Sequence, residues 1–207
     1  MTWIVDGSKI LQPDEMGKVL TDLREKSRRS INHRLNLIVF RLSSCAGLRA
    51  SEIAGLVLSD VRVDSDRPSI RVRKEVAKGH KARVVPLTWD ASTKDDLAAW
   101  KQFRRDQGAG DGDPFVCSQH RDSLGKPLER RGLRKRFKVA CKSLGPERQA
   151  ELTIHHGRHT FISLSLHGGL PITAVKAAAG HATIAVTNIY SHLVVDEHEE
   201  VRNLFAF

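Results

Sequence analysis

The sequence predicts a mixed α+β fold that is mainly helical and carries a small three-stranded antiparallel sheet. Apolar residues recur at helical spacing through most of the chain, but between about residues 60 and 87 their period changes to two. At 207 residues, with 40% hydrophobic and 28% charged residues, the chain is long enough to bury a full core and has the composition of a globular protein. We expect one domain over residues 14–207, preceded by a leader at residues 1–13.

The first third of the chain is expected to be helical. A first helix opens at Pro13, and a second, more buried helix runs from about Asn32 to Cys45, where Gly47 stops it. A short helical segment starting on Ser51 follows, so Arg49 lies at a junction between elements. The apolar face of the first helix consists of Met16, Val19, Leu20 and Leu23.

Residues 60–87 are expected to form the antiparallel sheet. The period of two runs from residue 70 to 76, as on a strand with one buried face. One set consists of Ile70, Val72, Lys74 and Val76, and it alternates with Arg71, Arg73 and Glu75. The segments VRVDS before this strand and ARVVPL after it are its predicted partners. The last turn, AKGHK, contains Gly79 and His80, which can supply the positive φ that a tight hairpin needs.

Helices are expected to dominate the second half of the chain. One helix, capped by Asp90 or Ser92, runs through Arg105, and the loop GAGDGDP follows it. The segment PFVCS at 114–118 is a candidate strand. Further helices are expected at residues 131–144, 158–167 and 172–179, then through Tyr190, and finally in the polar C-terminal segment, where Val201, Leu204 and Phe205 form an apolar stripe.

The charge and the apolar runs narrow the class of protein. A formal net charge of +10 and a pI near 9.9 indicate a polyanionic partner, with nucleic acid ahead of an anionic membrane surface. The most apolar run, LNLIVF, is far shorter than the roughly 20 residues of a membrane span. Without a secretory signal at the N-terminus, we expect a cytoplasmic, nucleoid-associated location. Cys45, Cys117 and Cys141 are widely spaced, which indicates reduced thiols.

Six residues combine cationic or proton-transferring side chains with the chain's single tyrosine: Arg49, Lys78, His155, Arg158, His181 and Tyr190. When a phosphodiester is attacked, negative charge gathers on its non-bridging and departing oxygens, and two arginines can hold such oxygens in forks. A histidine can carry the nucleophile's proton, and a lysine on a hairpin tip can protonate the leaving group. Two guanidiniums and an imidazole around the tyrosine are expected to favour its phenolate.

Each of these residues also has an interpretation without chemistry. Arg49 can be a surface cation, Lys78 a solvated or DNA-backbone-contacting residue, and Tyr190 a packing residue on an apolar helix face. The histidines of HHGRH suggest metal ligands, but no nearby carboxylate or cysteine completes a set of familiar spacing. Residues 172–190 also fit a helix-turn-helix, which would make the chain a DNA-binding protein without catalysis.

The order of these motifs resembles the catalytic domain of tyrosine recombinases, the phage-integrase and Xer-like family. The motifs are GLRASE, a hairpin lysine followed by RVVPL, then H-x-x-R-H-T, G-H and T-x-x-Y-S-H. The resemblance covers roughly residues 10–205, in the right order and with compatible spacings. It implies the tyrosine recombinase catalytic-domain fold and a site-specific recombinase or integrase that breaks and rejoins double-stranded DNA.

The resemblance assigns roles to individual residues. Arg49 and Arg158 look like the arginines that clamp the scissile phosphate, and Glu52 is similar to the acidic residue that supports the first of them. His155 corresponds to the general acid/base histidine and His181 to a further hydrogen-bond donor.

Lys78 matches the lysine that protonates the leaving 5′-oxygen, and Tyr190 the nucleophile that forms a 3′-phosphotyrosyl link. Such enzymes need no metal and no other cofactor, because the covalent link retains the energy of the phosphodiester. The residues expected to contact DNA are Lys81, Arg83, Arg134, Lys135, Lys138 and Thr187.

Some features depart from the family pattern. Integrases of this kind usually carry an N-terminal core-binding domain, whereas only about thirteen residues precede the first helix here, so weak DNA binding is expected. Gly157 stands where similar sequences tend to have leucine and is expected to loosen its helix, and AAAGH is smaller than the leucine-rich version of that motif.

The resemblance leaves the mode of assembly and one enzymatic alternative open. We expect a monomer when free and a homo-tetramer on DNA, joined through the C-terminal helix; the alternative is that this helix docks on its own protomer. A type IB topoisomerase-like nicking and closing enzyme remains the alternative within the same chemistry.

Overall fold

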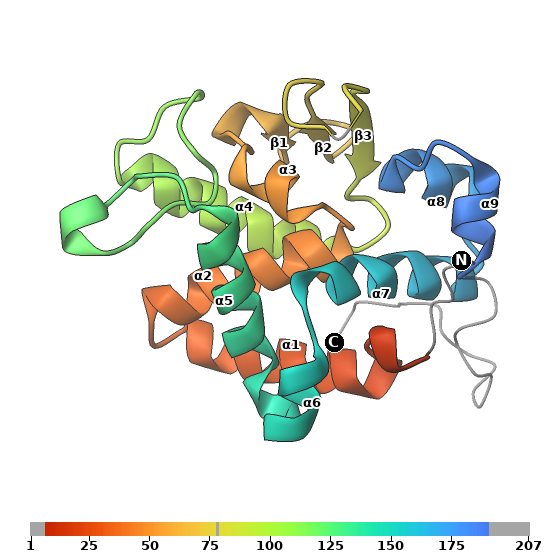
Figure 1. Cartoon of the computed structure of the whole chain (residues 1–207). Helices are drawn as coiled ribbons and strands as arrows, with labels where there is room; N and C mark the ends of the chain where they lie inside the picture. The colour runs from red at the N-terminus through yellow and green to blue at the C-terminus, as the bar shows by residue number, and fades with distance from the viewer. Residues whose placement is uncertain (1–6, 78, 191–207) are drawn as a thin grey trace.

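The computed structural model describes residues 7–77 and 79–190 (Figure 1). Two features predicted from the sequence, Lys78 and the C-terminal helix with its apolar stripe, lie outside the described residues. Within the described part of the chain, no helix is both long and apolar enough to cross a membrane. The described elements form the predicted mainly helical fold with a three-stranded antiparallel sheet.

The predicted first helix is confirmed as α1 (Pro13–Ser27), whose four predicted apolar residues are buried. It follows the short 3-10 helix η1 (Gly7–Lys9). Ile10 and Leu11 are fully buried, and the Leu11 backbone N–H donates to Thr160 Oγ1 at 2.8 Å. The described part of the predicted leader therefore belongs to the folded domain, because its apolar side chains fill the core.

The predicted second helix changes its geometry before its end. It consists of α2 (Ile31–Phe40) and a π-helical turn, η2 (Arg41–Cys45), which closes with the Ala46 N–H donating to Arg41 O at 3.0 Å. Gly47 follows with φ +65°, and a Cβ at this position would collide with the ring of Phe161. Since π-turns wind more loosely than α-turns, this insertion sets the direction in which the next residues leave the helix. The short helix α3 (Ala50–Ala54) then begins, one residue earlier than predicted.

The sheet has the order β1-β2-β3, with β1 (Val61–Arg62), β2 (Ser69–Val72) and β3 (Arg83–Pro86) all antiparallel. Ile70 on the middle strand pairs with Val61 on one side and Val85 on the other, and all three are buried. The strand ends at Val72 and not at Val76, because the N–H groups of residues 76 and 77 turn back to the carbonyl of residue 73. The predicted positive φ values are confirmed, at +79° for Gly79 and +52° for His80.

The second half of the chain is helical, as predicted. Asp90 caps α4 by accepting from the Ser92 N–H at 3.0 Å, and α8 has the predicted bounds, between Pro171 and Gly180. The candidate strand at 114–118 is wrong, since this segment makes only isolated bridges. The helices are α4 (Ala91–Asp106), α5 (Arg130–Ala140), α6 (Pro146–Glu151), α7 (Ile154–His167), α8 (Ile172–Ala179) and α9 (Ile184–Asn188), with 3-10 turns η3 (Leu58–Asp60), η4 (Arg121–Ser123) and η5 (Cys141–Leu144).

Helix α7 runs through the middle of the molecule, with the sheet on one side and α1 on the other (Figure 1). It packs against η2, and a Cβ at Gly157 would lie 2.6 Å from Ser44 Oγ and 2.9 Å from the ring of Phe137. The expectation that Gly157 loosens this helix is therefore wrong, because its missing side chain permits the close contact. Helix α8 packs against the edge strand β3, which brings the last third of the chain beside the sheet.

Candidate active site

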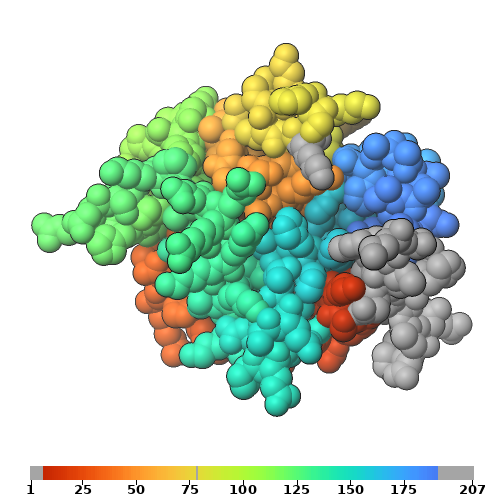
Figure 2. Space-filling view, viewed as in Figure 1, coloured from red at the N-terminus to blue at the C-terminus, as the bar shows by residue number. Residues whose placement is uncertain are grey.

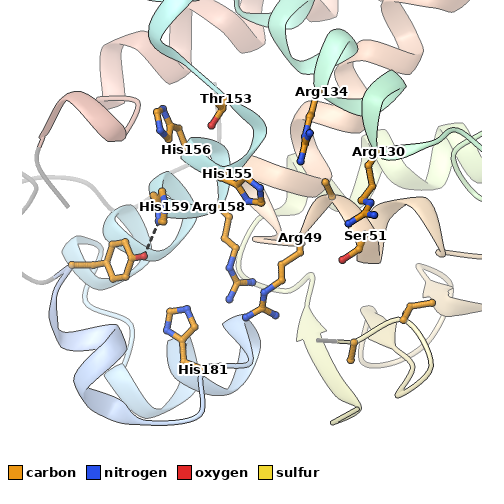
Figure 3. Close-up of a pocket in the computed structure, with 14 residues that line it drawn as sticks. Arg49, Ser51, Arg130, Arg134, Thr153, His155, His156, Arg158, His159 and His181 are labelled. Carbon is orange, nitrogen blue, oxygen red and sulfur yellow. Dashed lines mark hydrogen bonds between the residues drawn. The ribbon is translucent and has the colours of Figure 1, made fainter. Parts of the chain in front are cut away.

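A cavity of about 780 Å³ opens where α3, α5, α7 and the α8–α9 region meet. In Figure 2 the sheet region (yellow) and α8–α9 (blue) border the surface formed by α5 and α7 (green to teal). Five of the six predicted site residues line the cavity (Figure 3), and the sixth, Lys78, lies outside the described residues. The other lining residues include His159, for which no role was predicted. The five predicted lining residues are Arg49, His155, Arg158, His181 and Tyr190.

Arg49 stands at the N-terminus of α3 and is held there by Glu52. Its backbone N–H donates to Glu52 Oε2 at 2.8 Å, and its Nη1 donates to Glu52 Oε1 at 3.0 Å. Glu52 is fully buried, which raises the pKa of its carboxyl, but hydrogen bonds from Arg83 and Arg49 outweigh burial and leave the pKa below its usual value. The carboxylate therefore stays ionised and fixes the arginine at the cavity wall.

Arg83 was predicted to contact DNA, but its side chain points inward. Its Nη1 and Nη2 donate to the two carboxylate oxygens of Glu52, both at 2.7 Å, and its Nε donates to Ala178 O at 2.7 Å. Only 8% of the side chain is exposed. The predicted DNA contact does not fit this geometry, because the guanidinium is already engaged in joining β3, α3 and α8.

Arg158 projects from α7 and is 6% exposed. Its Nη1 donates to Gly47 O at 2.5 Å and its Nη2 donates to Ala179 O. Burial and the neighbouring charges of Arg49 and Arg83 lower the pKa of Arg158 to about 9. The guanidinium remains charged at neutral pH, but it lies in a place where further negative charge would stabilise it.

The C-terminal end of α8 organises these cations. The carbonyls of Ala178, Ala179 and Gly180 accept from Arg83, Arg158 and Arg49 respectively, the last at 3.4 Å. The final carbonyls of a helix lack partners within it and carry its negative dipole end, so they attract cations. Gly180 has φ +68°, and a Cβ there would lie 2.8 Å from Arg83 Cδ, so both the turn and the close approach require glycine.

His181 follows directly after this turn. Its Nδ1 lies 3.0 Å from Thr187 Oγ1, and its backbone N–H donates to Lys176 O at 3.2 Å. Thr187 was predicted to contact DNA, but it is fully buried and orients the histidine instead. This prediction fails because Thr187 lies on the inner face of α9.

Tyr190 is 6% exposed, and its hydroxyl lies 2.7 Å from His159 Nδ1, as the dashed line in Figure 3 marks. Its ring stacks against His159 and His181, with centroid distances of 5.5 and 6.2 Å. Burial raises the pKa of Tyr190 above its usual value, although Arg158 and Arg49 act in the opposite direction. The expected phenolate is therefore not favoured in this structure, because burial outweighs the two arginines.

Three of the histidines that line the cavity, His155, His159 and His181, favour their neutral forms. Burial, together with Arg158 among other charges, lowers the pKa of His181 to about 3, and burial, His156 and Arg158 lower that of His159 to about 4. The more exposed His155 also has a lowered pKa, from burial and then from Arg134, Arg158 and Arg49. A neutral imidazole offers one donor and one acceptor, so each ring can accept a proton as well as give one.

Residues 9–197 match the family model described as the phage integrase family. The chain belongs to the phage integrase family. It is 31% identical over 185 residues to the tyrosine recombinase XerC of Actinobacillus succinogenes, an alignment that covers 89% of this chain and 57% of that protein. The chain spans about half the length of the curated relatives it matches.

Solved structures share the fold of this phage integrase family member. A crystal structure of XerA recombinase matches with a TM-score of 0.70 and 23% identity, over 89% of this chain and 58% of that one. The pre-cleavage complex of XerH site-specific recombinase bound to difH substrate matches with a TM-score of 0.68 and 23% identity, over 89% of this chain and 50% of that one. The predicted tyrosine recombinase catalytic-domain fold is confirmed.

The other residues predicted to contact DNA differ in how exposed their side chains are. Lys81, Arg134 and Lys135 are exposed, and Arg134 lines the cavity together with Arg130, which was not predicted. Lys138 is only partly exposed, and its Nζ donates to the carbonyls of Gln149 and Ala150. Its predicted DNA contact does not fit, since these bonds tie it to α6.

No role was predicted for His159 from the sequence, although it belongs to the motif HHGRH. A histidine directly after the buried Arg158 is displaced by about 100° around α7, which turns it from the arginine pair toward α9. The helical position alone could have suggested this direction, but the contact with Tyr190 depends on how α9 folds back. Among the described residues, no group of three or more His, Cys, Asp or Glu side chains is placed to hold a metal ion.

Proposed function

We propose that this chain is the catalytic domain of a site-specific DNA recombinase in which Tyr190 is the nucleophile. The observation that carries the proposal is the convergence of Arg49, Arg158, His181 and Tyr190 on one cavity. Family membership supports it, and so do the names of the relatives, which are tyrosine recombinases. The net charge of +10 supports double-stranded DNA as the substrate.

In this proposal Arg49 and Arg158 hold the non-bridging oxygens of the scissile phosphate. Both guanidiniums border the cavity, and both keep N–H donors beyond those used on protein carbonyls. Phosphate binding neutralises the repulsion that lowers the pKa of Arg158. His181 adds a further donor, because a Thr187 hydroxyl that donates to Nδ1 leaves the proton on Nε2.

The Tyr190 oxygen then forms a bond to phosphorus while the bond from phosphorus to the 5′-oxygen breaks. The products are a 3′-phosphotyrosyl link and a 5′-oxygen that takes a proton from Lys78, with His155 as the second acid/base group. Attack by a 5′-hydroxyl of another strand reverses the step and completes strand exchange. The number of phosphate ester bonds is conserved, so the reaction requires neither ATP nor a cofactor.

The partners and the site of action follow from the same proposal. The exposed Lys81, Arg134 and Lys135 bind the DNA backbone, and binding weakens as salt rises because counterions are released. Strand exchange needs two duplexes and hence several protomers, for which we propose a tetramer on DNA joined through the C-terminal helix. The protein then acts on the nucleoid or on a mobile element in the cytoplasm.

The test is covalent trapping on a library of nicked duplexes with randomised sequence around the nick. Cleavage next to the nick releases a short fragment, so the protein–DNA link cannot be reversed and accumulates. We expect an adduct on a denaturing gel, which peptide mapping assigns to Tyr190, and no adduct with Tyr190→Phe, which removes a single oxygen. An adduct of equal yield in Tyr190→Phe, or none with wild type, contradicts the proposal.

The same preparations separate the two other functions. A helix-turn-helix protein without catalysis selects DNA sequences but gives no adduct, and Tyr190→Phe keeps every activity. A topoisomerase-like enzyme gives the adduct and relaxes supercoiled plasmid but never joins ends from two different duplexes. Joined products from two labelled duplexes are the outcome expected of a recombinase.

A further inference from the structure

The hydroxyl of Tyr190 is hydrogen-bonded to His159, a residue of the H-x-x-R-H motif outside the six predicted site residues. The distance from the phenol oxygen to His159 Nδ1 is 2.7 Å, a normal length for a hydrogen bond of a hydroxyl. The two rings also stack, with a centroid distance of 5.5 Å and an interplanar angle of 25°. Contact through both the ring face and the polar atom holds the tyrosine in one orientation relative to the histidine.

The surroundings of the phenol favour His159 as acceptor of this hydrogen bond. The charged groups that most strongly affect Tyr190 are the guanidiniums of Arg158 and Arg49, which only donate. The nearby His181 engages its Nδ1 with Thr187. In this arrangement the Tyr190 hydroxyl can donate to the lone pair of His159 Nδ1, which requires that the imidazole proton is on Nε2.

We infer that His159 is the group that removes the proton from Tyr190 during attack on DNA and returns it when the strand is rejoined. The inference rests on the proposed function and assigns to His159 a step that the resemblance gave to His155. In the forward step the O–H bond of Tyr190 breaks, the proton bonds to Nδ1, and the freed electron pair forms the bond to phosphorus. Rejoining reverses each of these changes, and no further reactant is needed.

The charge balance of the cavity fits this role. The pKa of His159 is lowered to about 4 by burial and neighbouring cations, so its lone pair is unprotonated at neutral pH. The phosphate brought by DNA adds negative charge beside Arg158 and His159, which raises the affinity of the imidazole for a proton. The base therefore becomes effective when the substrate is bound.

The kinetic test compares wild type with His159→Asn on a nicked duplex selected by the wild-type protein. Asparagine can keep a hydrogen bond to the phenol but cannot accept its proton. We expect adduct formation by His159→Asn to be slower by about 10²-fold or more, as is typical for loss of a general base. Its rate should rise with pH, because hydroxide must replace the base, while the wild-type rate stays nearly constant from about pH 6 to 8.

A matched control is His167→Asn, the same substitution two to three turns further along α7 and outside the cavity. It should keep the wild-type rate and pH profile. If His159→Asn also keeps the wild-type rate and pH profile, His159 only positions the tyrosine and the inference is overturned. Wild-type adduct formation in the same experiment tests the proposed function separately.

A second measurement needs no DNA. Nitrogen-15 NMR of the imidazole groups, with His159 assigned by its loss in His159→Asn, reports which ring nitrogen carries the proton. We expect the Nε2–H form with an unprotonated Nδ1 that faces Tyr190. An Nδ1–H form, donating to the phenol oxygen, contradicts the inference even if the protein proves to be a recombinase.

Discussion

Arg41 and Arg158 are both buried arginines, but their surroundings differ. Arg41 is fully buried, and its Nε and Nη1 donate to Asp96 and Asp90 at 2.8 and 3.2 Å. Burial acts to lower its pKa, but Cys45, Asp96 and Asp90 raise it above its usual value. Arg158 donates to two backbone carbonyls, and its pKa is lowered to about 9.

The number of carboxylates explains the difference. Two aspartates surround Arg41, whereas Arg49, Arg83 and Arg158 share the carboxylate of Glu52. The Arg41 cluster is neutralised within the fold and serves to join α2, η2 and α4. The Arg158 cluster keeps an excess of positive charge at a cavity, which a phosphate would neutralise. Uncompensated charge, and not burial itself, distinguishes the candidate active site.

The largest expected effect on stability comes from Arg41→Met. This change leaves Asp90 and Asp96 without their shared cation, and breaking a buried ion pair typically costs about 3–5 kcal/mol. Urea denaturation followed by circular dichroism measures the free energy of unfolding. A loss smaller than about 1 kcal/mol would show that the ion pairs of Arg41 do not stabilise the fold as proposed.

Arg158→Lys should affect catalysis more than stability. A lysine cannot hold a phosphate in a fork, and loss of one such contact typically costs about 10²–10³-fold in rate. The readout is the rate of adduct formation on the selected nicked duplex, with Arg121→Lys in the exposed turn η4 as matched control. Stability should change less than in Arg41→Met, and a variant that retains the wild-type rate contradicts the distinction between the clusters.

Sulfate should stabilise the folded protein by binding at Arg49 and Arg158. At a concentration ten times the dissociation constant, a bound anion adds about 1.4 kcal/mol to the free energy of unfolding. Sulfate also stabilises proteins by exclusion from their surface, so the measurement compares the rise in Tm of wild type with that of Arg158→Met. Equal rises in the two proteins would mean that the cavity binds no anion.

Stability is also expected to depend on pH, because two histidines have lowered pKa values in the folded protein. The folded pKa values of His159 and His181, about 4 and 3, lie below the unfolded value of about 6.5. The unfolded chain therefore binds more protons in this range, and stability decreases as pH is lowered from about 6.5 toward 4. His159→Asn combined with His181→Asn should reduce this slope in urea denaturation, and an unchanged slope would contradict the lowered pKa values.

Local signals predicted the elements that end at distinctive residues. Pro171 and Gly180 delimit α8, and Asp90 caps α4, because these residues restrict the backbone on their own. The π-turn at Arg41–Cys45 was not predictable, since it depends on the packing of η2 against α7 and not on the residues within it. The role of Gly157 was equally unpredictable from local sequence, because it lies in the close approach of α7 to Ser44 and Phe137.

Within the site, the motifs predicted which residues meet but not how they are connected. Arg83 and Thr187 were expected to contact DNA. Both turn inward because the buried Glu52 and the partly buried His181 require hydrogen-bond partners that only the folded structure supplies. The contact of His159 with Tyr190 likewise joins residues 31 positions apart.

The most direct test of the excess positive charge is a crystal grown with tungstate, whose anomalous scattering locates the ion as a substitute for phosphate. We expect a tungstate bound by the guanidiniums of both Arg49 and Arg158, with His181 within hydrogen-bonding distance. A protein saturated with tungstate at other sites, but with none between these two arginines, would contradict this expectation.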